Sequence, residues 1–563
     1  MHELSDFTPL RPAEQQLVAW LQAGNREPCV ISAQLPAPDA PAQMRLRASL
    51  VRYLVRGGCA ACPLPETGLR LFGALIEGDG PPGAQTRGLD LDGARLPGDL
   101  VLIRCRLPEL VLLRSARVEN LFFNGSALPA GLAADRLLAY GDVVFDDAVT
   151  GAPAGGLNVR GAATPGAGKS GDALFVDRLE ARGPLFLDGS AARGEVRLLG
   201  ARLGGDLSCT GAHFGAGRDE RALSADRIDV TGDIFLSGAT VEGELRLLGA
   251  RVGGDLNCYG AQLSAHGARW ALHAQGARVT GSFVLRGDAS VRGMMNLTRA
   301  EIGAMTDLAG SWPAAGNLLL NRCRYGGFTG PGTPITAEAR IDWLARQDGS
   351  LSGGDFWSQP WEECARVLRE MGHDSEARAV LVEKERRQRA ARRARLRAQG
   401  EGTRAAVFAA WDRLMGMTTR YGREPLWAFA WLIGFWLLGI VAFEAARQGD
   451  MLKPNDSIVL RAAEWTECVP GAARNAGGHS QLACFLAQPE GASFPVFNAP
   501  VYSADALMPI VDLGMQSNWV PDENTLAGAG ARAYLWLHIT LGWALSLLAV
   551  AGFSGLIRID NNS

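Results

Sequence analysis

Three short motifs in this 563-residue chain carry residue types that could do chemistry. The first, Ala163-Thr-Pro-Gly-Ala-Gly-Lys-Ser170, satisfies a relaxed phosphate-loop pattern, in which backbone N–H groups and the positive end of a following helix bind phosphate. The residues from Leu174 onward align, 49 positions later, with those from Leu223, in a repeat that predicts strands. Since no helix is then available to the motif, we expect an insertion loop and no nucleotide site.

The second motif, Cys59-Ala-Ala-Cys62, could be a redox pair or half of a zinc site. A zinc site needs two further ligands at short spacing and none is near, so we interpret the motif as a turn. Cys209 and Cys258 occupy equivalent repeat positions, which predicts small core residues. The seven histidines form no metal-spaced pair and no catalytic triad follows from spacing, so we expect no metal, no cofactor and no catalytic residue. Whether the chain is an enzyme stays open.

The third motif, Phe497–Gly514, lies between two apolar runs. This arrangement resembles the two-helix ion channels, in which a Phe/Tyr-Ser-rich pore helix precedes a filter of backbone carbonyls. The resemblance covers about 425–560 and implies a pore segment containing Ser503, Asp505, Asp512 and Gly514. However, Pro509–Gly514 lacks the glycine spacing of that filter. We therefore favour an amphipathic helix at the outer membrane surface.

These motifs must be positioned by a repetitive fold, because two stretches, Gly194–Ala212 and Gly243–Ala261, nearly copy each other. Within them a unit close to Gly-Asp/Glu-Leu-x-Leu-x-Gly-Ala-x-Val returns every 11 residues, as Val230, Val241 and Val252 show. Such self-similarity is typical of a solenoid, with alternate strand residues inside and Gly-Ala at the corners. The sequence predicts a mainly β fold: a parallel β-solenoid of 11-residue rungs with α-helical caps and a C-terminal two-helix transmembrane hairpin.

Changes of period divide the chain into six predicted segments. They are a helical N-terminal cap (1–67), the β-solenoid (68–325), a helical hairpin with a basic juxtamembrane helix (334–400), a juxtamembrane segment with the first transmembrane helix (401–445), an exported loop domain (446–530) and the second transmembrane helix with a tail (531–563). In the cap we expect helices at Pro12–Gln22 and Pro41–Arg56; the second could instead lie on a membrane surface. Trp361–Lys384 is predicted to be a helix, a turn at Gly372 and a second helix.

The apolar runs Leu426–Phe443 and Ala533–Ile557 are long enough to cross a bilayer. Twelve Lys or Arg within 384–423 precede the first run, and the positive-inside rule assigns this segment to the cytosol, against anionic lipid headgroups. The membrane-proximal basic residues that we single out are Arg386, Arg387, Arg389, Arg392 and Arg393. No cleavable signal peptide is visible at Met1. We expect a multi-pass protein of the bacterial inner membrane with the solenoid and C-terminal tail cytosolic.

The 446–530 loop is acidic and should be exported, where an even pair of cysteines can oxidise, so we expect a disulfide between Cys468 and Cys484. His538 lies inside the second run. An ionisable group there could be functional within the membrane, or it could be solvated near the interface. A net charge of −3 gives no general attraction to nucleic acid. A local partner surface is expected on a ladder of outward arginines, either engaging an acidic protein or simply solvated: Arg197, Arg202, Arg246 and Arg251.

The helix at Arg45–Leu54, the Gly-Ala-Arg-Val-Gly-Gly-Asp-Leu rungs, the Trp361–Lys384 hairpin and the closing membrane pair are together similar to bacterial pentapeptide-repeat-like β-solenoid membrane proteins. Some of these are labelled membrane-associated oxidoreductases, but no dinucleotide or haem motif is found here. We predict a membrane-anchored scaffold or protein-interaction platform without catalysis and with an unknown protein partner. A channel with a cytosolic solenoid regulatory domain is the alternative, an oxidoreductase a distant third, and homo-oligomerisation is left open.

Overall fold

The fold is described from a computed structural model, which defines residues 3–58, 60–79, 88–150, 172–217, 220–349, 356–419 and 426–553. The chain divides into two compact units, Met1–Lys384 and Glu385–Ser563, and each is described by itself. The phosphate-loop-like stretch 163–170 and Cys59 lie outside the described residues, so the expectations for them stay predictions.

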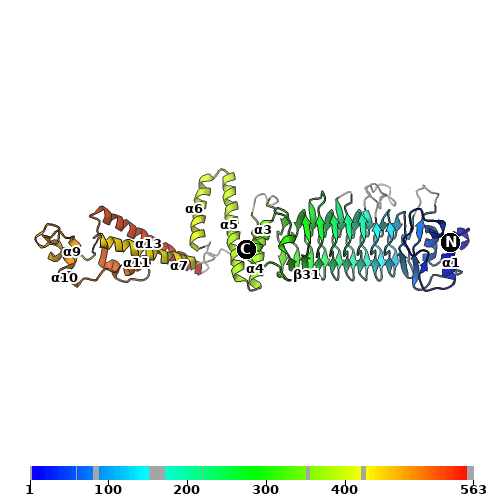
Figure 1. Cartoon of the computed structure of the whole chain (residues 1–563), viewed down its shortest axis with the longest axis horizontal. Helices are drawn as coiled ribbons and strands as arrows, with labels where there is room; N and C mark the ends of the chain where they lie inside the picture. The colour runs from blue at the N-terminus through cyan, green and yellow to red at the C-terminus, as the bar shows by residue number, and fades with distance from the viewer. Residues whose placement is uncertain are drawn as a thin grey trace. The chain divides into compact units, whose positions relative to one another are not determined.

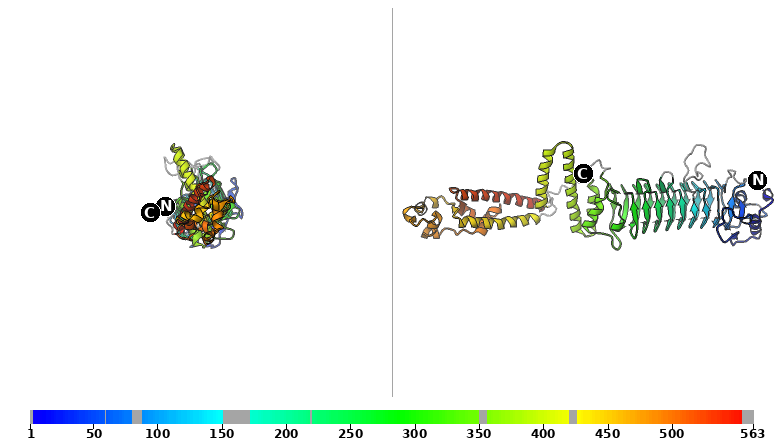
Figure 2. Two further views of the ribbon diagram at one scale, coloured as in Figure 1. Left: turned by 90° about the vertical axis from the view of Figure 1, so that its left-hand side faces the viewer. Right: turned by 45° about the horizontal axis from the view of Figure 1, so that its top comes forward.

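The first unit is a parallel β-solenoid of about nine turns, whose short strands stack on their equivalents in the neighbouring turns (Figures 1 and 2). Its largest sheet has 18 strands and contributes two strands to most turns. These strands are β1 (Cys29–Val30), β3 (Gly68–Phe72), β5 (Asp99–Ile103), β7 (Arg117–Val118), β8 (Leu121–Phe122), β11 (Leu138–Ala139), β12 (Val143–Val144), β15 (Glu180–Ala181), β16 (Leu185–Phe186), β19 (Arg202–Leu203), β20 (Leu207–Ser208), β23 (Asp229–Val230), β24 (Ile234–Phe235), β27 (Arg251–Val252), β28 (Leu256–Asn257), β31 (Arg278–Leu285), β34 (Glu301–Asp307) and β36 (Arg324–Tyr325).

Two further sheets close the turns. The nine-stranded sheet comprises β6 (Val111–Leu112), β10 (Leu132–Ala133), β14 (Asp172–Phe175), β18 (Glu195–Arg197), β22 (Arg221–Ser224), β26 (Glu244–Arg246), β30 (Trp270–His273), β33 (Met294–Asn296) and β35 (Leu318–Leu319). The seven-stranded sheet comprises β9 (Ala127–Leu128), β13 (Val149–Thr150), β17 (Ala191–Arg193), β21 (His213–Gly215), β25 (Thr240–Glu242), β29 (Gln262–Ser264) and β32 (Ser290–Arg292). Parallel stacking on all sides buries an apolar interior.

Strand register shows how the sequence repeat maps onto the turns. Leu185 pairs with Leu207, one turn later, and Leu207 pairs with Ile234, one further turn along. Two turns therefore carry the chain 49 residues, which is the spacing between Gly194–Ala212 and Gly243–Ala261. The long repeat is thus a pair of turns.

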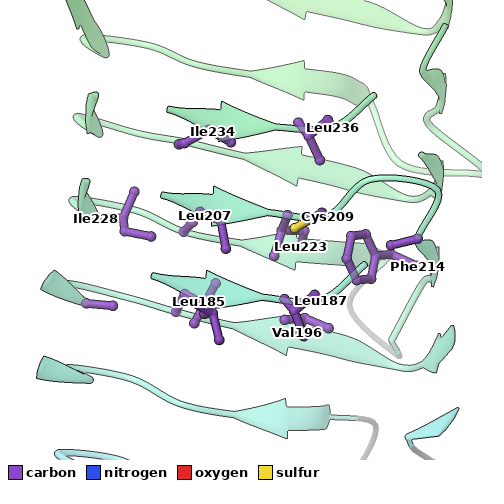
Figure 3. Packing of buried hydrophobic residues seen from close by; sticks show 14 of the residues in the cluster. Leu185, Leu187, Val196, Leu207, Cys209, Phe214, Leu223, Ile228, Ile234 and Leu236 are labelled. Carbon is purple, nitrogen blue, oxygen red and sulfur yellow. The ribbon is translucent and has the colours of Figure 1, made fainter. Parts of the chain in front are cut away.

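The interior is a continuous column of Leu, Val, Ala, Cys and Phe side chains (Figure 3). Cys209 and Cys258 are completely buried, which confirms that they are core residues. Burial raises the pKa of the Cys258 thiol to about 12, so this sulfur stays protonated and unreactive at neutral pH. At the corners Gly200 and Gly249 adopt φ of 66° and 63°, which glycine reaches without steric cost.

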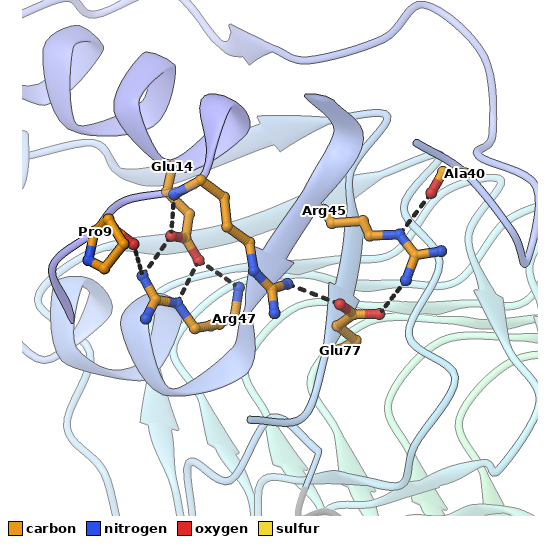
Figure 4. A network of polar contacts seen from close by, with 7 residues as sticks. Pro9, Glu14, Ala40, Arg45, Arg47 and Glu77 are labelled. Atoms are coloured by element: carbon orange, nitrogen blue, oxygen red, sulfur yellow. Dashed lines mark hydrogen bonds and ion pairs between the residues drawn. The ribbon is translucent and has the colours of Figure 1, made fainter. Parts of the chain in front are cut away.

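The N-terminal end contains α1 (Pro12–Gln22), as the sequence predicts, and α2 (Ala48–Val55). The helix expected at Pro41–Arg56 is wrong in its first half: β2 (Arg45–Arg47) pairs in parallel with β4 (Leu75–Glu77), extending the ladder into this segment. Polar contacts join β2 to α1 (Figure 4). The fully buried Glu14 of α1 accepts hydrogen bonds from Arg47 Nε at 2.8 Å and from Arg47 Nη2 at 2.6 Å. A strand here allows Arg47 to reach α1.

At the other end, α3 (Ala337–Ala345), α4 (Gln359–Glu370) and the start of α5 (Asp374–Ala398) pack against the last turns. The buried Arg340 of α3 forms a bidentate pair with Asp307 of β34, at 2.9 and 2.7 Å, and its guanidinium lies 3.6 Å from the ring centroid of Phe328. Gly372 has a φ of 86° between α4 and α5, as expected for the turn of the hairpin. These contacts fix the helices against the last turns.

The second unit contains most of α5, then α6 (Gly402–Thr419), and two long apolar helices, α7 (Leu426–Gln448) and α13 (Leu526–Phe553). Trp427–Gln448 and Leu526–Val550 are long and apolar enough to cross a membrane. Between them lie β37 (Leu452–Pro454), α8 (Ala463–Thr466), α9 (Gln481–Leu486), α10 (Pro489–Ala492), α11 (Ala499–Leu507), α12 (Met515–Asn518) and β38 (Trp519–Pro521). The antiparallel pair β37–β38 closes this insertion.

Candidate functional site

The strongest candidate site is in the second unit, where α11 packs against both α7 and α13. The helix begins because the Asn498 side chain accepts from the backbone N–H of Val501 at 3.2 Å and Pro500 occupies the first turn. Its buried residues are Ala499, Tyr502, Ser503, Asp505, Ala506 and Leu507. A helix buried on this much of its surface is part of the core formed by the two long helices.

A chain of polar contacts joins the three helices at Ser503. Its hydroxyl donates to the backbone carbonyl of Trp436 at 2.9 Å and lies 3.3 Å from His538 Nε2. The same His538 nitrogen lies 3.2 Å from the Ser503 carbonyl oxygen, which can only accept, so the proton is assigned to Nε2. Tyr534 Oη lies 3.4 Å from the other ring nitrogen of His538. His538 is thus buried and hydrogen-bonded, and the solvated alternative is excluded by this packing.

Two glycines make this close approach possible. A Cβ at Gly439 of α7 would lie 2.1 Å from Ser503 Oγ and 2.7 Å from His538 Cε1. On α13, a Cβ at Gly542 would lie 2.0 Å from the carbonyl oxygen of Leu507. Any larger residue would therefore push α11 away from the helix pair.

These contacts also show how far α11 reaches along the two helices. At 1.5 Å per residue, Trp436 is about 12 Å along α7 from Glu444, and Gly542 is about 15 Å along α13 from Arg532. Glu444 and Arg532 are the charged residues that border the apolar part of each helix on the insertion side. The end of α11 therefore lies near the middle of the apolar stretch. The helix packs between α7 and α13, and the amphipathic helix expected at the outer membrane surface stays a prediction.

The segment after α11 is non-helical, and hydrogen bonds to the Asp505 side chain hold its backbone. This carboxylate accepts from the backbone N–H of Leu513 at 2.6 Å and of Gln516 at 2.7 Å, and it is 8% exposed. Asp512 accepts from Gly514 N at 2.9 Å, and Gly514 turns the chain with a φ of 73°. Of the four residues predicted for a pore segment, Ser503 and Asp505 are thus buried, whereas Asp512 and Gly514 shape the following loop.

The outward side of this segment is largely apolar, with the exposed Asp512 as its charged residue. Ile510 is 90% exposed, and Met508, Val511 and Leu513 are also exposed. We call Met508–Leu513 the apolar loop. A loop that is tied down by a buried carboxylate yet exposes this many large apolar side chains is suited to contact another apolar or protein surface.

The insertion carries the predicted disulfide, Cys468–Cys484, with a Cα–Cα distance of 5.6 Å. Asn475 Nδ2 donates to the Cys468 carbonyl at 2.9 Å, and Lys453 Nζ pairs with Asp522 at 3.0 Å beside the β37–β38 ladder. The seven free cysteines of the described residues are all buried. The insertion is therefore a cross-linked small domain attached to the ends of α7 and α13.

The predicted arginine ladder divides into two pairs, and half of it is wrong. Arg197 is 9% exposed and pairs with Asp177 at 2.7 Å, and the half-buried Arg246 pairs with Asp226 at 2.7 Å. Both turn along the solenoid surface toward a carboxylate of the preceding turn.

Arg202 and Arg251 do point outward, with side chains 73% and 70% exposed. Each lies beside an acid of the preceding turn, Glu180 at 3.3 Å and Asp229 at 4.0 Å. In register, this exposed column reads Glu180, Arg202, Asp229, Arg251, Arg278, Glu301. We call its first four residues the charged column; their signs alternate, whereas the next pair, Arg251 and Arg278, are like charges.

The membrane-proximal arginines all lie on α5, and three of them turn toward α6. Arg389 and Arg393 both pair with Asp412 of α6, the first at 3.0 Å, and the guanidinium of Arg392 lies 4.5 Å from the ring centroid of Phe408. Arg386 is exposed and Arg387 is half-buried. The basic segment is thus partly used to hold a helical hairpin together, which charge counting alone did not predict.

Within the described ranges, no group of three or more His, Cys, Asp or Glu side chains could hold a metal ion. Cys62 is buried. No known family, curated protein or solved structure matches this chain. The similarity to pentapeptide-repeat-like membrane proteins therefore stays a prediction.

Proposed function

We propose that the chain is an oligomeric membrane protein in which α11 and the apolar loop form a re-entrant segment beside a path for ions or small polar solutes, with the solenoid as its cytosolic domain. The observation that carries this proposal is the position of α11 between α7 and α13, packed at Gly439, about 8 Å along α7 from Glu444, and at Gly542, about 15 Å along α13 from Arg532. The sequence placed this function second, behind a scaffold.

The argument rests on backbone hydrogen bonding in lipid. The hydrocarbon core is about 30 Å thick, so a segment about 15 Å from the bordering charges is at its centre. Non-helical backbone at that depth is tolerated only where protein or a water-filled cavity covers it. The apolar loop is non-helical and Ile510 is exposed, so one copy of the chain leaves it uncovered. Further copies around a hydrated axis would cover it.

The orientation follows from charge and oxidation. We infer that α5 and α6 lie on the cytosolic side, because their many arginines favour that face of the bacterial inner membrane. The Cys468–Cys484 disulfide supports an oxidising compartment for the insertion, whereas buried free thiols suit a reducing one for the solenoid. The C-terminal tail, which lies outside the described residues, would return to the cytosol.

The finer features of the solenoid belong to the same proposal. An 11-residue rung would be half of a 22-residue turn, such as the one from Leu185 to Leu207. The α1–α2 segment and the α3–α4 segment would act as its caps. Membership of the pentapeptide-repeat-like family is proposed on this repeat.

The test is reconstitution of the full chain into liposomes, with ion flux and the mass of the assembly measured on the same preparation. We expect flux and a mass of several copies. A monomeric mass together with no flux for any small ion would overturn the proposal. The variant Gly439→Ala should reduce the flux, because it disturbs the packing of α11 against α7. The β-structure of the solenoid should stay unchanged and serves as the control for folding.

A protein-interaction platform is the second candidate, and the charged column favours it. Parallel ladders hold Arg202 and Arg251 two turns apart in fixed register, with Asp229 between them. A partner with the complementary alternation could bind this rigid surface. Reversing the charge at both positions, with Arg202→Glu and Arg251→Glu, should release such a partner from membrane pull-downs. An unchanged set of partners would contradict the protein-interaction proposal.

A further inference from the structure

Helix α6 exposes an apolar face on the second unit. Val407, Trp411, Leu414 and Met417 are 70%, 53%, 48% and 60% exposed. Their spacing of four, three and three residues places them on one side of the helix. Large apolar side chains that recur in this way usually mark a surface that meets lipid or another protein. We call these four residues the α6 face.

The polar residues of α6 are arranged around this face in a particular way. The one acidic residue of the helix, Asp412, is buried and paired with Arg389 and Arg393 of α5. The two basic residues of α6, Arg404 and Arg413, are exposed, and on a helical projection they border the α6 face on its two sides. Within α6, negative charge is therefore buried and positive charge is exposed, while Arg404 also pairs with Glu401, the residue before the helix, at 2.7 Å.

The helix is also tied to the first candidate span. Trp431 Nε1 of α7 donates to the backbone carbonyl of Met417 at 2.9 Å, so the last turns of α6 lie at the beginning of α7. α6 contacts α13 as well. If α7 crosses a bilayer, as the proposed function requires, the α6 face is at the depth where the bilayer meets the cytosol.

We propose that the α6 face lies in the headgroup region of an anionic cytosolic leaflet, with Arg404 and Arg413 extended to lipid phosphates and carboxylates. An apolar face bordered by cationic side chains is what interfacial helices present, since long basic side chains bury their stems and keep their charges in the headgroups. The α5–α6 hairpin is then a membrane-surface element that joins the solenoid to the spans.

A second copy of the chain is a poorer occupant of this surface. Two α6 faces brought together would place the arginines of both edges, and the arginine-rich α5 helices behind them, near one another. Like charges brought together in this way cost free energy, whereas anionic headgroups attract each arginine. The charges therefore favour lipid.

The experiment uses the full chain in lipid nanodiscs, with an environment-sensitive fluorophore at Leu414→Cys. The matched control is Ala390→Cys, which is exposed on α5, and the wild type reports any label on native cysteines. In discs containing phosphatidylserine we expect a blue-shifted emission and several-fold stronger quenching by spin-labelled lipid at 414 than at 390. Phosphatidylcholine discs, high salt, or Arg404→Ala with Arg413→Ala should each reduce the difference.

Each outcome decides between explanations. Equal, water-like emission at 414 and 390 in anionic discs would overturn this inference and leave the spans intact. Failure of the chain to incorporate into any disc would overturn both the inference and the proposed function on which it rests. Shielding of 414 that persists in detergent, together with a dimeric mass, would assign the α6 face to a second copy and overturn the lipid proposal.

Discussion

Buried charges in the first unit are stabilised by partners that come from neighbouring turns or from the end helices. Glu14 with Arg47 and Asp307 with Arg340 each join a helix to a strand of the ladder. A buried pair of this kind adds little net stability compared with apolar residues, but loss of one partner leaves an uncompensated charge. Such pairs therefore fix how the end helices dock.

The pair at Glu14 gives a pH-dependent prediction. Burial opposes ionisation of Glu14, but hydrogen bonds and charge from Arg47 outweigh it, so the pKa of Glu14 is lowered. Its stabilising contribution is present above the ordinary glutamate pKa of about 4.3 and is lost as pH falls through the lower pKa of the folded state. Glu14→Gln should reduce the free energy of unfolding at neutral pH by about 2–4 kcal/mol.

This difference should begin to narrow as the pH falls below about 4.3, where the glutamate of the unfolded chain takes up a proton, and should be smallest below the lowered pKa of the folded state. Urea unfolding followed by the circular dichroism of the β-structure, at neutral and at acid pH, measures both effects. Glu27→Gln is the matched control, because Glu27 is exposed. A constant gap between wild type and Glu14→Gln across this range would show that the carboxylate charge is not what stabilises α1.

Two glycines on α7 give a second residue-scale prediction. A Cβ at Gly439 would lie 2.1 Å from Ser503 Oγ, whereas a Cβ at Gly434 would meet nothing within 4 Å. Gly439→Ala should displace α11 and lower the unfolding temperature of the detergent-solubilised protein, while Gly434→Ala should leave it unchanged or raise it, since alanine favours helix. Equal melting temperatures for the two variants would mean that α11 does not pack at Gly439.

At the scale of elements, the insertion between α7 and α13 depends on its disulfide. Cys468 and Cys484 enclose a loop with a sequence separation of 16. Closing a loop of that length lowers the conformational entropy of the unfolded chain and so stabilises the folded domain by about 3 kcal/mol. The double variant Cys468→Ser with Cys484→Ser should therefore make this domain easily digested by protease. In intact cells, an impermeant thiol reagent should label these two residues only after reduction. Labelling without reductant would show that the pair is not oxidised.

Elements that repeat or bury a regular face were predictable, and those decided by distant partners were not. α1 follows from its apolar spacing and Pro12, and its predicted and observed bounds agree. β2 was expected to be helix because Arg45–Arg47 has helix-compatible residues; its pairing with β4 overrides that preference. For α11, Gly439 and Gly542 were the available signal, since glycines within an apolar span often mark close helix packing.

The same distinction applies to side chains on the solenoid surface. The repeat predicted that Arg197 points outward, but the side chain is buried and pairs with Asp177, a carboxylate of the preceding turn. The partner is 20 residues away in sequence and adjacent only because of the turn length. The stacked strands can therefore be predicted from the period of the sequence repeat. The charge pattern on their surface can be predicted only once it is known which residues of neighbouring turns lie side by side.

At the scale of the whole molecule, the apolar loop predicts how copies meet. If it covers a shared axis, Ile510 of one copy should lie near Ile510 of the next, because rotational symmetry brings equivalent loops together. Ile510→Cys should then form a disulfide-linked pair of chains on mild oxidation in native membranes. Leu437→Cys is the matched control: it is 53% exposed on α7 and would face lipid. Cross-linking at 437 but not at 510 would place the contact between copies on the outer surface of the helices and leave the re-entrant segment without a partner.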